Sequence, residues 1–311
     1  MNYEAMIEAR TKEVNEKILS YLPKEEGYQK TVIEAMNYSF RVGGKRLRPF
    51  LMQEIYTMCG GTKKIVEPFM AALEMIHTYS LVHDDLPEMD DDELRRGMPT
   101  THKKYGQAMG VLAGDGLLNY AMETAMRAFD LCSQQDNENI IKALQVLFNK
   151  SGIYGMIGGQ TLDVEAEKTN HELELGELLF IDENKTAALL EAALMCGAIL
   201  AGADEKVVDQ FEKVGSLVGT AFQIQDDILD ITSTTQVLGK PVGSDERNHK
   251  KTYVTYYGLE EAKKDQERFS LEAISMLDSY GTEATLTLTP ESEEAKQIVI
   301  ALIRRLVSRK M

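Results

Sequence analysis

The chain has 311 residues, of which 43% are hydrophobic and 27% charged, a composition typical of a folded globular protein. Its formal net charge of −16 disfavours nucleic acid and anionic membranes as partners. Three isolated cysteines, Cys59, Cys132 and Cys196, support neither a disulfide framework nor a zinc site. The charged N-terminus predicts no secretory signal, and apolar stretches well short of about 20 residues predict no membrane span, so we expect a cytoplasmic protein.

Helical periodicity dominates the chain, and strand-like alternation is scarce. Helices are expected over residues 1–22, 27–40, about 49–59, 67–86, 109–131, 137–150, 172–202, 206–231 and 253–280. Pro49 suits the first turn of the third helix, and Gly60 and Gly61 close that helix. The stretch 285–294, with Pro290, looks less regular, and we attach no function to it. Because no repeat, low-complexity tract or linker interrupts the pattern, we predict one all-α domain spanning residues 1–311, with ten or more helices.

An aspartate cluster stands at the end of the apolar helix predicted over 67–86. Asp84 and Asp85 close this helix, and Pro87 breaks it. On an ideal helix Asp90 would lie about 240° around the axis from Asp84, at about 100° per residue, too far to share a site. The break therefore makes it possible for a turn to bring Asp90 back towards Asp84.

A second aspartate cluster lies within an unbroken helix. Asp226 and Asp230 are spaced i and i+4 on one face, Asp227 lies between them, and Gln223 is one turn earlier on the same stripe. The neighbouring residues are mostly apolar, so these carboxylates would repel one another strongly without a cation. A lone cluster of this kind is often a solvated acidic patch. Two clusters with only oxygen ligands favour a hard metal ion, Mg²⁺ over Zn²⁺.

Basic residues accompany both clusters. A glycine turn at a predicted helix start, residues 43–49, carries Lys45, Arg46 and Arg48, a good anion site. Further cations stand at Arg95, Arg96, Lys185, Lys240 and Lys250. Each alone is most often a structural surface charge. Together with Mg²⁺ held by aspartates, they suit the oxygens of a diphosphate.

These motifs closely resemble those of the trans-isoprenyl diphosphate synthases, in particular the bacterial farnesyl diphosphate synthase type. The likeness runs through GGKRLRP at 43–49, HDDLPEMDDDELRRG at 83–97, LAGDGLL at 112–118, QIQDDILD at 223–230 and LGKPVGSD at 238–245. The resemblance implies a bundle of mostly antiparallel helices around a deep central cavity, a homodimer, and three Mg²⁺ ions per active site. The expected substrates are isopentenyl diphosphate and the allylic dimethylallyl and geranyl diphosphates.

The resemblance also implies roles for matching positions. Metal ligands would be Asp84, Asp85, Asp90, Asp226 and Asp230. The resemblance also implies that Asp227 is catalytic. It further implies that the allylic diphosphate is contacted by Arg95, Lys185, Lys240 and Lys250. Isopentenyl diphosphate would be held by Gly44, Lys45, Arg48, His77 and Arg96. Oxygens of Thr186 and Gln223 would face the reacting carbons. The sequence departs from the family at one motif: the family commonly has Gly-Lys-x-Thr, and here His249 stands in place of the glycine. This departure weakens the assignment of Lys250.

The expected reaction is ionisation of the allylic C–O bond, attack by the double bond of isopentenyl diphosphate, and loss of a proton. Tyr79 and Ser80 would set product length. An ideal helix places Ser80 one turn below Asp84, so the assignment of Tyr79 as the cavity floor depends on the resemblance. An aromatic residue there is typical of a C15 product. A lone histidine on an apolar helix, such as His77, is more often a satisfied core residue, and the resemblance favours substrate contact instead.

Four alternatives remain open. The most serious is a geranylgeranyl diphosphate synthase, which makes a C20 product. A metal phosphohydrolase of the HD type is suggested by His83 and Asp84, but it needs further metal-binding histidines and leaves the second cluster unexplained. A terpene cyclase has no use for a second diphosphate site. The GGKRLRP motif and the Arg95–Arg96 pair indicate such a site and therefore argue against a cyclase. An inactive partner subunit usually lacks one aspartate cluster, and both are intact here.

Overall fold

The computed structural model describes residues 2–169, 171–232, 251–282 and 288–307, which are almost entirely helical. The predicted all-α class with ten or more helices is confirmed. The helices are α1 (Tyr3–Leu19), α2 (Lys30–Arg41), α3 (Leu47–Met58), α4 (Val66–Asp84), α5 (Thr101–Tyr105), α6 (Gln107–Met126), α7 (Asn137–Ser151), α8 (Met156–Thr169), α9 (Leu175–Ile181), α10 (Ala188–Ala201), α11 (Glu205–Thr232), α14 (Tyr253–Tyr257), α15 (Leu259–Ser279) and α16 (Pro290–Val307).

Shorter elements connect these helices. The only sheet within the described ranges is a hairpin of β1 (Leu94–Arg95) and β2 (Met98–Pro99), which follows α4. A π-helix (Asp182–Ala187) joins α9 to α10, and 3₁₀ turns occupy Arg127–Asp130 and Gln134–Asp136. The hairpin and the π-helix both carry residues of the predicted site.

The core is built around α4 and α10, whose sequences are apolar on nearly every face. All of α10 except its last residue is buried, and it packs against α3, α7 and α11. The other central helix, α4, packs against α6 and α3. Gly197 allows the close approach of α10 to α3, because a Cβ there would lie 2.7 Å from the Met52 carbonyl oxygen. Two buried helices thus provide the rigid support for the site.

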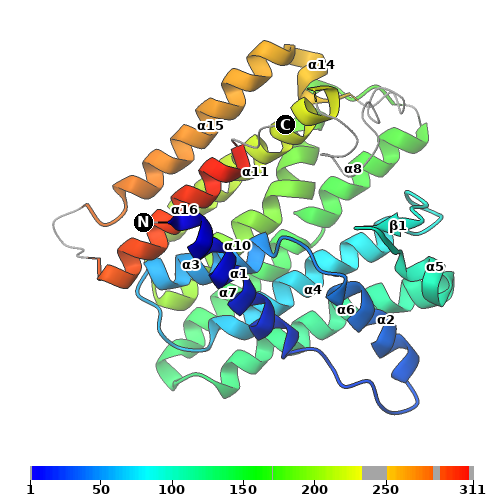
Figure 1. Cartoon of the computed structure of the whole chain (residues 1–311), viewed down its shortest axis with the longest axis horizontal. Coiled ribbons are helices and arrows are strands. Elements are labelled where there is room, and N and C mark those ends of the chain that lie inside the picture. The colour runs from blue at the N-terminus through cyan, green and yellow to red at the C-terminus, as the bar shows by residue number, and fades with distance from the viewer. Residues whose placement is uncertain (1, 170, 233–250, 283–287, 308–311) are drawn as a thin grey trace.

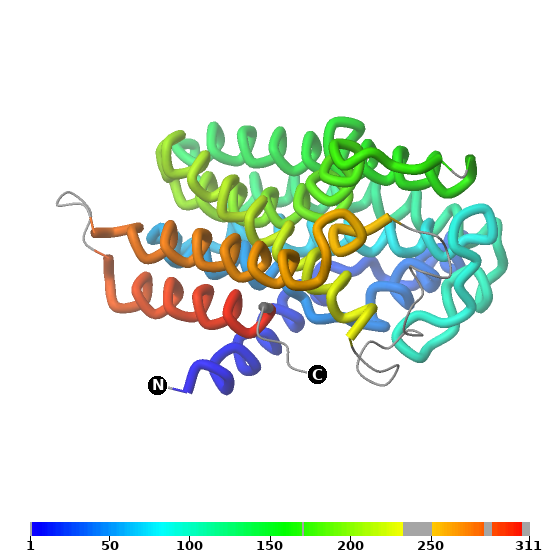
Figure 2. The backbone as a smooth tube through the Cα atoms, turned by 90° about the horizontal axis from the view of Figure 1, so that it is seen from above, coloured from blue at the N-terminus to red at the C-terminus, as the bar shows by residue number. Residues whose placement is uncertain are grey.

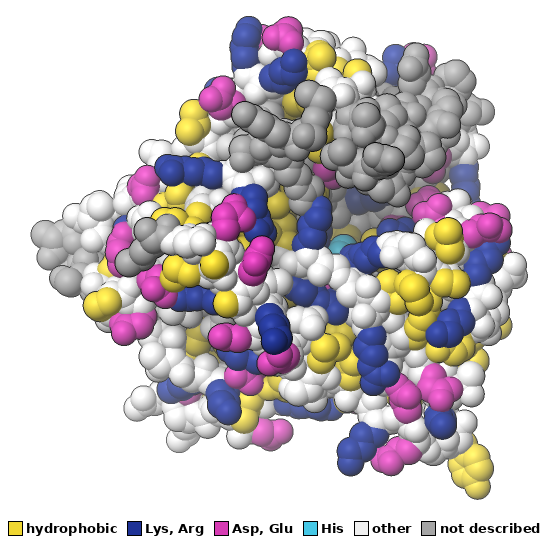
Figure 3. Space-filling view, in the orientation of Figure 1, with side chains coloured by type: hydrophobic (Ala, Val, Ile, Leu, Met, Phe, Trp, Pro, Cys, Tyr) yellow, Lys and Arg dark blue, Asp and Glu magenta, His cyan; other side chains and the backbone are white. Residues whose placement is uncertain are grey.

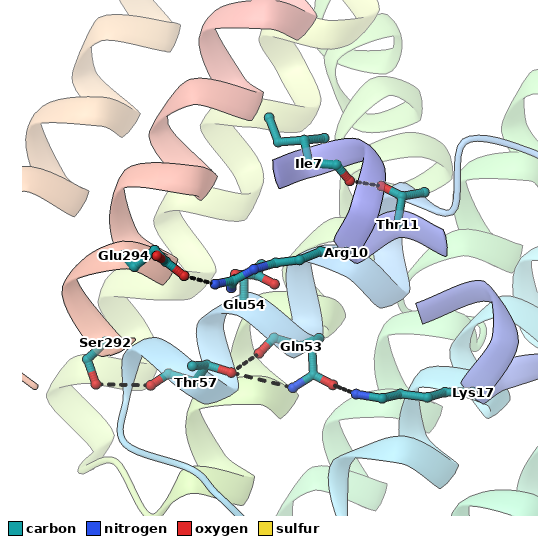
Figure 4. Close-up of polar contacts among 9 residues, drawn as sticks. All are labelled: Ile7, Arg10, Thr11, Lys17, Gln53, Glu54, Thr57, Ser292 and Glu294. Carbon is teal, nitrogen blue, oxygen red and sulfur yellow. Dashed lines mark hydrogen bonds and ion pairs between the residues drawn. The ribbon is translucent and has the colours of Figure 1, made fainter. Parts of the chain in front are cut away.

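The long helices lie side by side, many with their axes roughly aligned, as the two ribbon views show (Figures 1 and 2). At one side of the bundle α15 and α16 pack against each other and against α11, and α1 packs on α16. Arg10 of α1 joins three helices by pairing with Glu54 of α3 at 2.5 Å and with Glu294 of α16 (Figure 4). Ser292 also donates to the Thr57 carbonyl oxygen at 3.1 Å (Figure 4). This junction holds the two ends of the described chain to the core.

Several elements differ from the sequence predictions. The helix expected over 253–280 is two helices, because Gly258 adopts a φ of +79° between α14 and α15. The helix expected over 172–202 begins at Leu175 and contains the π-helix. Neither α8 nor α16 was predicted. Pro290, interpreted as a sign of irregularity, instead opens α16, where its missing N–H costs nothing.

One helical segment is long and apolar enough to span a membrane by length and composition alone. It runs from Leu175 to Ala201 with a mean hydropathy of 1.3, and 78% of its apolar window is buried inside the fold. Such burial is what a core helix of a globular protein shows. The prediction that no segment spans a membrane is therefore in keeping with where this helix lies.

Candidate active site

A cavity of about 670 Å³ opens between α4, α6, α8 and the π-helix. Its apolar wall includes Leu118, Met156, Ile157, Val164 and Leu189. Its polar lining includes many of the predicted site residues: Arg48, His77, Tyr79, Ser80, Asp84, Lys185 and Thr186. In the space-filling view, lysine and arginine side chains gather around a hollow in the middle of the face shown (Figure 3). An apolar cavity beside cations and a carboxylate suits an amphiphilic anion.

The first aspartate cluster has the turn that its proline predicted. Beyond the end of α4, the chain folds back so that the Asp90 N–H donates to the Asp84 carbonyl oxygen at 2.9 Å. The Asp84 side chain lines the cavity. Burial raises the pKa of Asp84 to about 6, Lys185 opposes this shift, and Asp90 adds to it by repulsion. A bound cation would relieve the cost of keeping this carboxylate ionised.

Asp85 is held on a different side of the turn. Its Oδ1 accepts a hydrogen bond from Arg95 Nε at 2.7 Å, and its side chain is 4% exposed. With Arg95 and Arg96 it lines a small hollow next to the main cavity. The two adjacent aspartates therefore differ, because Asp84 faces the cavity whereas Asp85 positions Arg95.

The second aspartate cluster lies on α11 and connects to the cavity through Gln223. Thr186 of the π-helix donates to Gln223 Oε1 at 3.2 Å, and Gln223 Nε2 donates to Asp227 Oδ1 at 3.2 Å. The other Asp227 oxygen accepts from the backbone N–H of Tyr253 at 2.9 Å, at the start of α14. Asp226 is half-buried, whereas Asp230 is buried at 2% exposure. Asp227 thus orients Gln223 and anchors α14.

The glycine turn, α4 and the hairpin bring a cluster of cations together. Arg48 is half-buried and lines the cavity with His77. Burial lowers the pKa of His77 well below its ordinary value, and Arg48 and Arg96 lower it further, so this histidine is neutral. Gly44 makes room for Arg96, because a Cβ at position 44 would lie 2.6 Å from Arg96 Nη2. Lys45 of the same turn lies 6.0 Å from the centre of the Phe222 ring. The arrangement concentrates positive charge for an anion.

Three site residues on α8 were missed by the sequence analysis. Gln160 Nε2 donates to Asp84 Oδ1 at 2.7 Å, and Asp163 pairs with Lys185 Nζ at 2.5 Å. Lys168 donates to the Glu88 carbonyl oxygen at 2.6 Å, which fastens the aspartate turn to α8. The available signal was Gly159, which precedes a Gln-x-x-Asp pattern. A Cβ at position 159 would collide with the backbone nitrogen of Lys185.

Tyr79 and Ser80, the residues predicted to set product length, both line the cavity. The Tyr79 ring meets the His83 ring edge-on, with 5.8 Å between centroids. The buried Tyr79 hydroxyl has no hydrogen-bond partner among the described residues. His83 Nε2 lies 3.1 Å from the Val111 carbonyl oxygen on α6, so this ring nitrogen is engaged in a contact within the fold.

Two predicted ligands, Lys240 and Lys250, lie outside the described residues. Within the described ranges, no group of three or more His, Cys, Asp or Glu side chains is arranged to hold a metal ion by itself. The donor set nevertheless fits a hard cation, because Asp84 and Asp90 offer oxygens alone. A metal ion at this turn would therefore complete its coordination with oxygens from water or a ligand.

Comparison with known proteins identifies the family. The model of the polyprenyl synthetase family matches residues 29–285. The chain belongs to the polyprenyl synthetase family. A farnesyl diphosphate synthase from Geobacillus stearothermophilus is 40% identical over 278 residues, which cover 88% of this chain and 90% of that protein. A geranylgeranyl diphosphate synthase from Cyanophora paradoxa is 44% identical over 246 residues, 78% of this chain and 79% of that protein.

Solved structures agree with this family assignment. The crystal structure of a geranyltransferase from Helicobacter pylori, complexed with magnesium and isoprenyl diphosphate, has a TM-score of 0.81 to this polyprenyl synthetase. The two are 30% identical, and the match covers 98% of each chain. The resemblance drawn from the sequence motifs is thus confirmed. The position of His83 also removes the argument for an HD-type phosphohydrolase, because its ring contacts the α6 backbone and Tyr79.

Proposed function

We propose that this polyprenyl synthetase is a Mg²⁺-dependent prenyltransferase that condenses isopentenyl diphosphate with dimethylallyl and geranyl diphosphates to give (2E,6E)-farnesyl diphosphate. One observation carries the proposal: a single apolar cavity is lined by Asp84 and Lys185 and also by Arg48 and His77. Two anionic headgroups can thus bind beside one hydrocarbon pocket.

The allylic diphosphate is assigned to the aspartate side of the cavity. Asp84, Asp85, Asp90, Asp226 and Asp230 are the candidate ligands for three Mg²⁺ ions, and Arg95, Lys185, Lys240 and Lys250 are the candidate direct contacts. The bound Mg²⁺ would neutralise the negative charge that develops on the departing diphosphate. Lys185 lies in the cavity with its Nζ held by Asp163, so its ammonium group is already oriented near Asp84.

Isopentenyl diphosphate is assigned to the arginine side. Arg48 and Arg96 provide planar donor groups that match a diphosphate, and Lys45 provides a point charge. Gly44 keeps the turn close to Arg96. Burial, and then the arginines around it, lower the pKa of His77, so this side chain can donate one hydrogen bond to the ligand without repelling those arginines.

The chain's own residues then account for the course of the reaction. Cations around the allylic diphosphate favour cleavage of its C–O bond, and the double bond of isopentenyl diphosphate attacks the resulting carbocation. Oxygens of Thr186 and Gln223, joined by a hydrogen bond, stand on the π-helix and α11 where they can stabilise that cation. The released pyrophosphate takes the proton. The apolar wall of the cavity excludes water that would otherwise trap the cation.

A C15 product is proposed because the Tyr79 ring lines the cavity and is packed against His83. A C20 product is the second candidate, since the relative from Cyanophora paradoxa is named a geranylgeranyl diphosphate synthase. The two candidates share every charged residue of the site. They differ only in how far the growing chain can extend past Tyr79.

We further propose that the protein works as a cytoplasmic homodimer. Helix α6 exposes an apolar stripe that includes Val111, Leu112, Met122 and Met126, each at least 40% exposed. Exposed apolar side chains gathered on one face of a helix favour an interface with another protein. A second copy of the chain would bury the stripe.

Turnover of labelled isopentenyl diphosphate tests the assignment of the metal ligands. We expect activity to require Mg²⁺, and Asp84→Ala or Asp226→Ala to lose nearly all of it. Glu88→Gln, an exposed change in the same turn, should retain activity. Full turnover in the presence of a chelator, or in either alanine variant, would contradict the proposal.

A further inference from the structure

Two cations of the GGKRLRP turn, Lys45 and Arg46, do not line the main cavity. Arg48 lines that cavity, whereas the side chain of Arg46 is only 3% exposed and points into the protein. Its backbone has a φ of +49°, in the left-handed region that a non-glycine residue rarely adopts. The unusual conformation lies between two residues, Lys45 and Arg48, that are assigned to isopentenyl diphosphate.

Partners on three helices hold the Arg46 guanidinium. Nη1 donates to Glu74 Oε1 at 2.7 Å, Nε donates to Asn15 Oδ1 at 2.9 Å, and Nη2 donates to the Phe40 carbonyl oxygen at 2.7 Å. These partners belong to α4, α1 and α2 respectively. The guanidinium also lies over the Phe40 ring, 4.8 Å from its centre. Only a planar group with several fixed donors can satisfy this set.

The same residue begins helix α3. The Arg46 carbonyl oxygen accepts from the Phe50 N–H at 3.1 Å, and Arg48 lies in the first turn that this bond closes. Fixing Arg46 therefore fixes the direction in which Arg48 leaves the turn. The partner Glu74 is 3% exposed and acts electrostatically on Arg48 and Arg96 as well, so one carboxylate supports the whole arginine group.

We propose that Arg46 and Glu74 are positioning residues for isopentenyl diphosphate: their buried ion pair holds the left-handed turn that presents Lys45 and Arg48 to the ligand. The inference depends on the proposed function for the identity of the ligand. Neither residue touches the reacting atoms. Their effect should therefore fall on the binding of one substrate.

The test compares Arg46→Lys with a matched control, Arg10→Lys. Arg10 also pairs with a buried carboxylate, Glu54, which lies on α3, the helix that Arg46 begins. This pair lies at the junction with α16, away from the glycine turn (Figure 4). Both variants keep the charge and lose the planar fork. We expect Arg46→Lys to raise the KM for isopentenyl diphosphate on the order of tenfold, while the KM for geranyl diphosphate and kcat change much less. Arg10→Lys should lower Tm without changing either KM.

Calorimetric titration with isopentenyl diphosphate alone separates this inference from the proposed function. If the wild type makes no farnesyl diphosphate, the proposed function fails, yet the binding comparison still tests the turn. Glu74→Asp, which keeps the charge but draws the carboxylate back from Arg46, should weaken binding in the same direction. Equal changes in KM for both substrates, or binding unchanged in both Arg46→Lys and Glu74→Asp, would overturn the inference.

Discussion

The ring of Tyr79 lines the cavity together with its apolar wall, and the proposed function assigns to this ring the limit on product length. Replacing it by serine removes the ring and should shift the product from C15 towards C20. Tyr79→Phe is the matched control, because it keeps the ring and removes only a hydroxyl that has no partner among the described residues. Chromatography of the dephosphorylated products measures the ratio. A serine variant that still stops at C15 would show that another residue limits the chain.

The sequence showed which residues belong to the site more reliably than it showed what each residue does there. The motifs placed Arg46 and Arg48 together, and nothing in the pattern distinguished the buried one from the one that lines the cavity. That distinction arises from a left-handed backbone and from partners on three helices, which are tertiary features. Asp84 and Asp85 likewise look equivalent in sequence, yet Asp84 lines the main cavity and Asp85 lines a separate hollow with Arg95.

Among the elements, α8 and the π-helix depend on a close contact at Gly159. A Cβ at that position would collide with the backbone that carries Lys185. Gly159→Ala should therefore lower kcat/KM about tenfold and destabilise the fold by about 1–3 kcal/mol, the usual cost of overpacking. Gly176→Ala is the control, because a Cβ there meets nothing within 4 Å. Steady-state kinetics and thermal melting measure both variants, and wild-type values for Gly159→Ala would refute the contact.

The junction of α1, α3 and α16 contains a carboxylate that should make stability depend on pH. Burial raises the pKa of Glu54 from 4.5 to about 7, and the Arg10 charge opposes this shift. Because the pKa of Glu54 is higher in the folded state, between pH 4.5 and about 7 the folded protein holds a proton on Glu54 that the unfolded chain has lost. Stability from this group is thus full below pH 4.5 and is lost as the pH rises through about 7.

Glu54→Gln removes that titration and provides the comparison. Chemical denaturation of both proteins between about pH 5 and 7 should show the wild type losing stability relative to Glu54→Gln, by at most about 1.4 kcal/mol per pH unit. Parallel pH profiles for the two proteins would contradict a raised pKa at Glu54.

Helices were predictable where apolar residues recur with helical periodicity, as in α7 and α11, and where long apolar stretches occur, as in α4 and α10. Two kinds of element escaped. Helix α8 carries glycines and polar residues that serve the site, so its periodicity is weak, and the π-helix depends on packing against α8 and α11. Gly258 breaks a helix through its left-handed φ, which a sequence pattern alone does not reveal.

At the scale of the whole molecule, the exposed stripe of α6 predicts self-association. Met122→Glu would place a charge in the proposed interface, so light scattering should show a monomer in place of a dimer. Leu271→Glu, on the exposed side of α15, is the control and should remain a dimer. A wild type that is monomeric at all concentrations would remove this proposal.

The overall architecture followed from the motifs more than from the helix boundaries. Two aspartate clusters and a glycine turn indicated the family, and the resemblance to that family predicted the fold. The cavity itself could not be derived from periodicity, because it depends on how α4, α6, α8 and the π-helix meet. Its volume and lining enter only with the structure.

Product length is the most direct test of the central claim. Purified protein would be incubated with labelled isopentenyl diphosphate and the C5, C10 or C15 allylic diphosphate, with and without Mg²⁺. We predict a C15 product from the C5 and C10 primers, no extension of the C15 primer, and no product without Mg²⁺. A C20 or longer product would contradict the role of Tyr79, and no product from any primer would contradict catalysis itself.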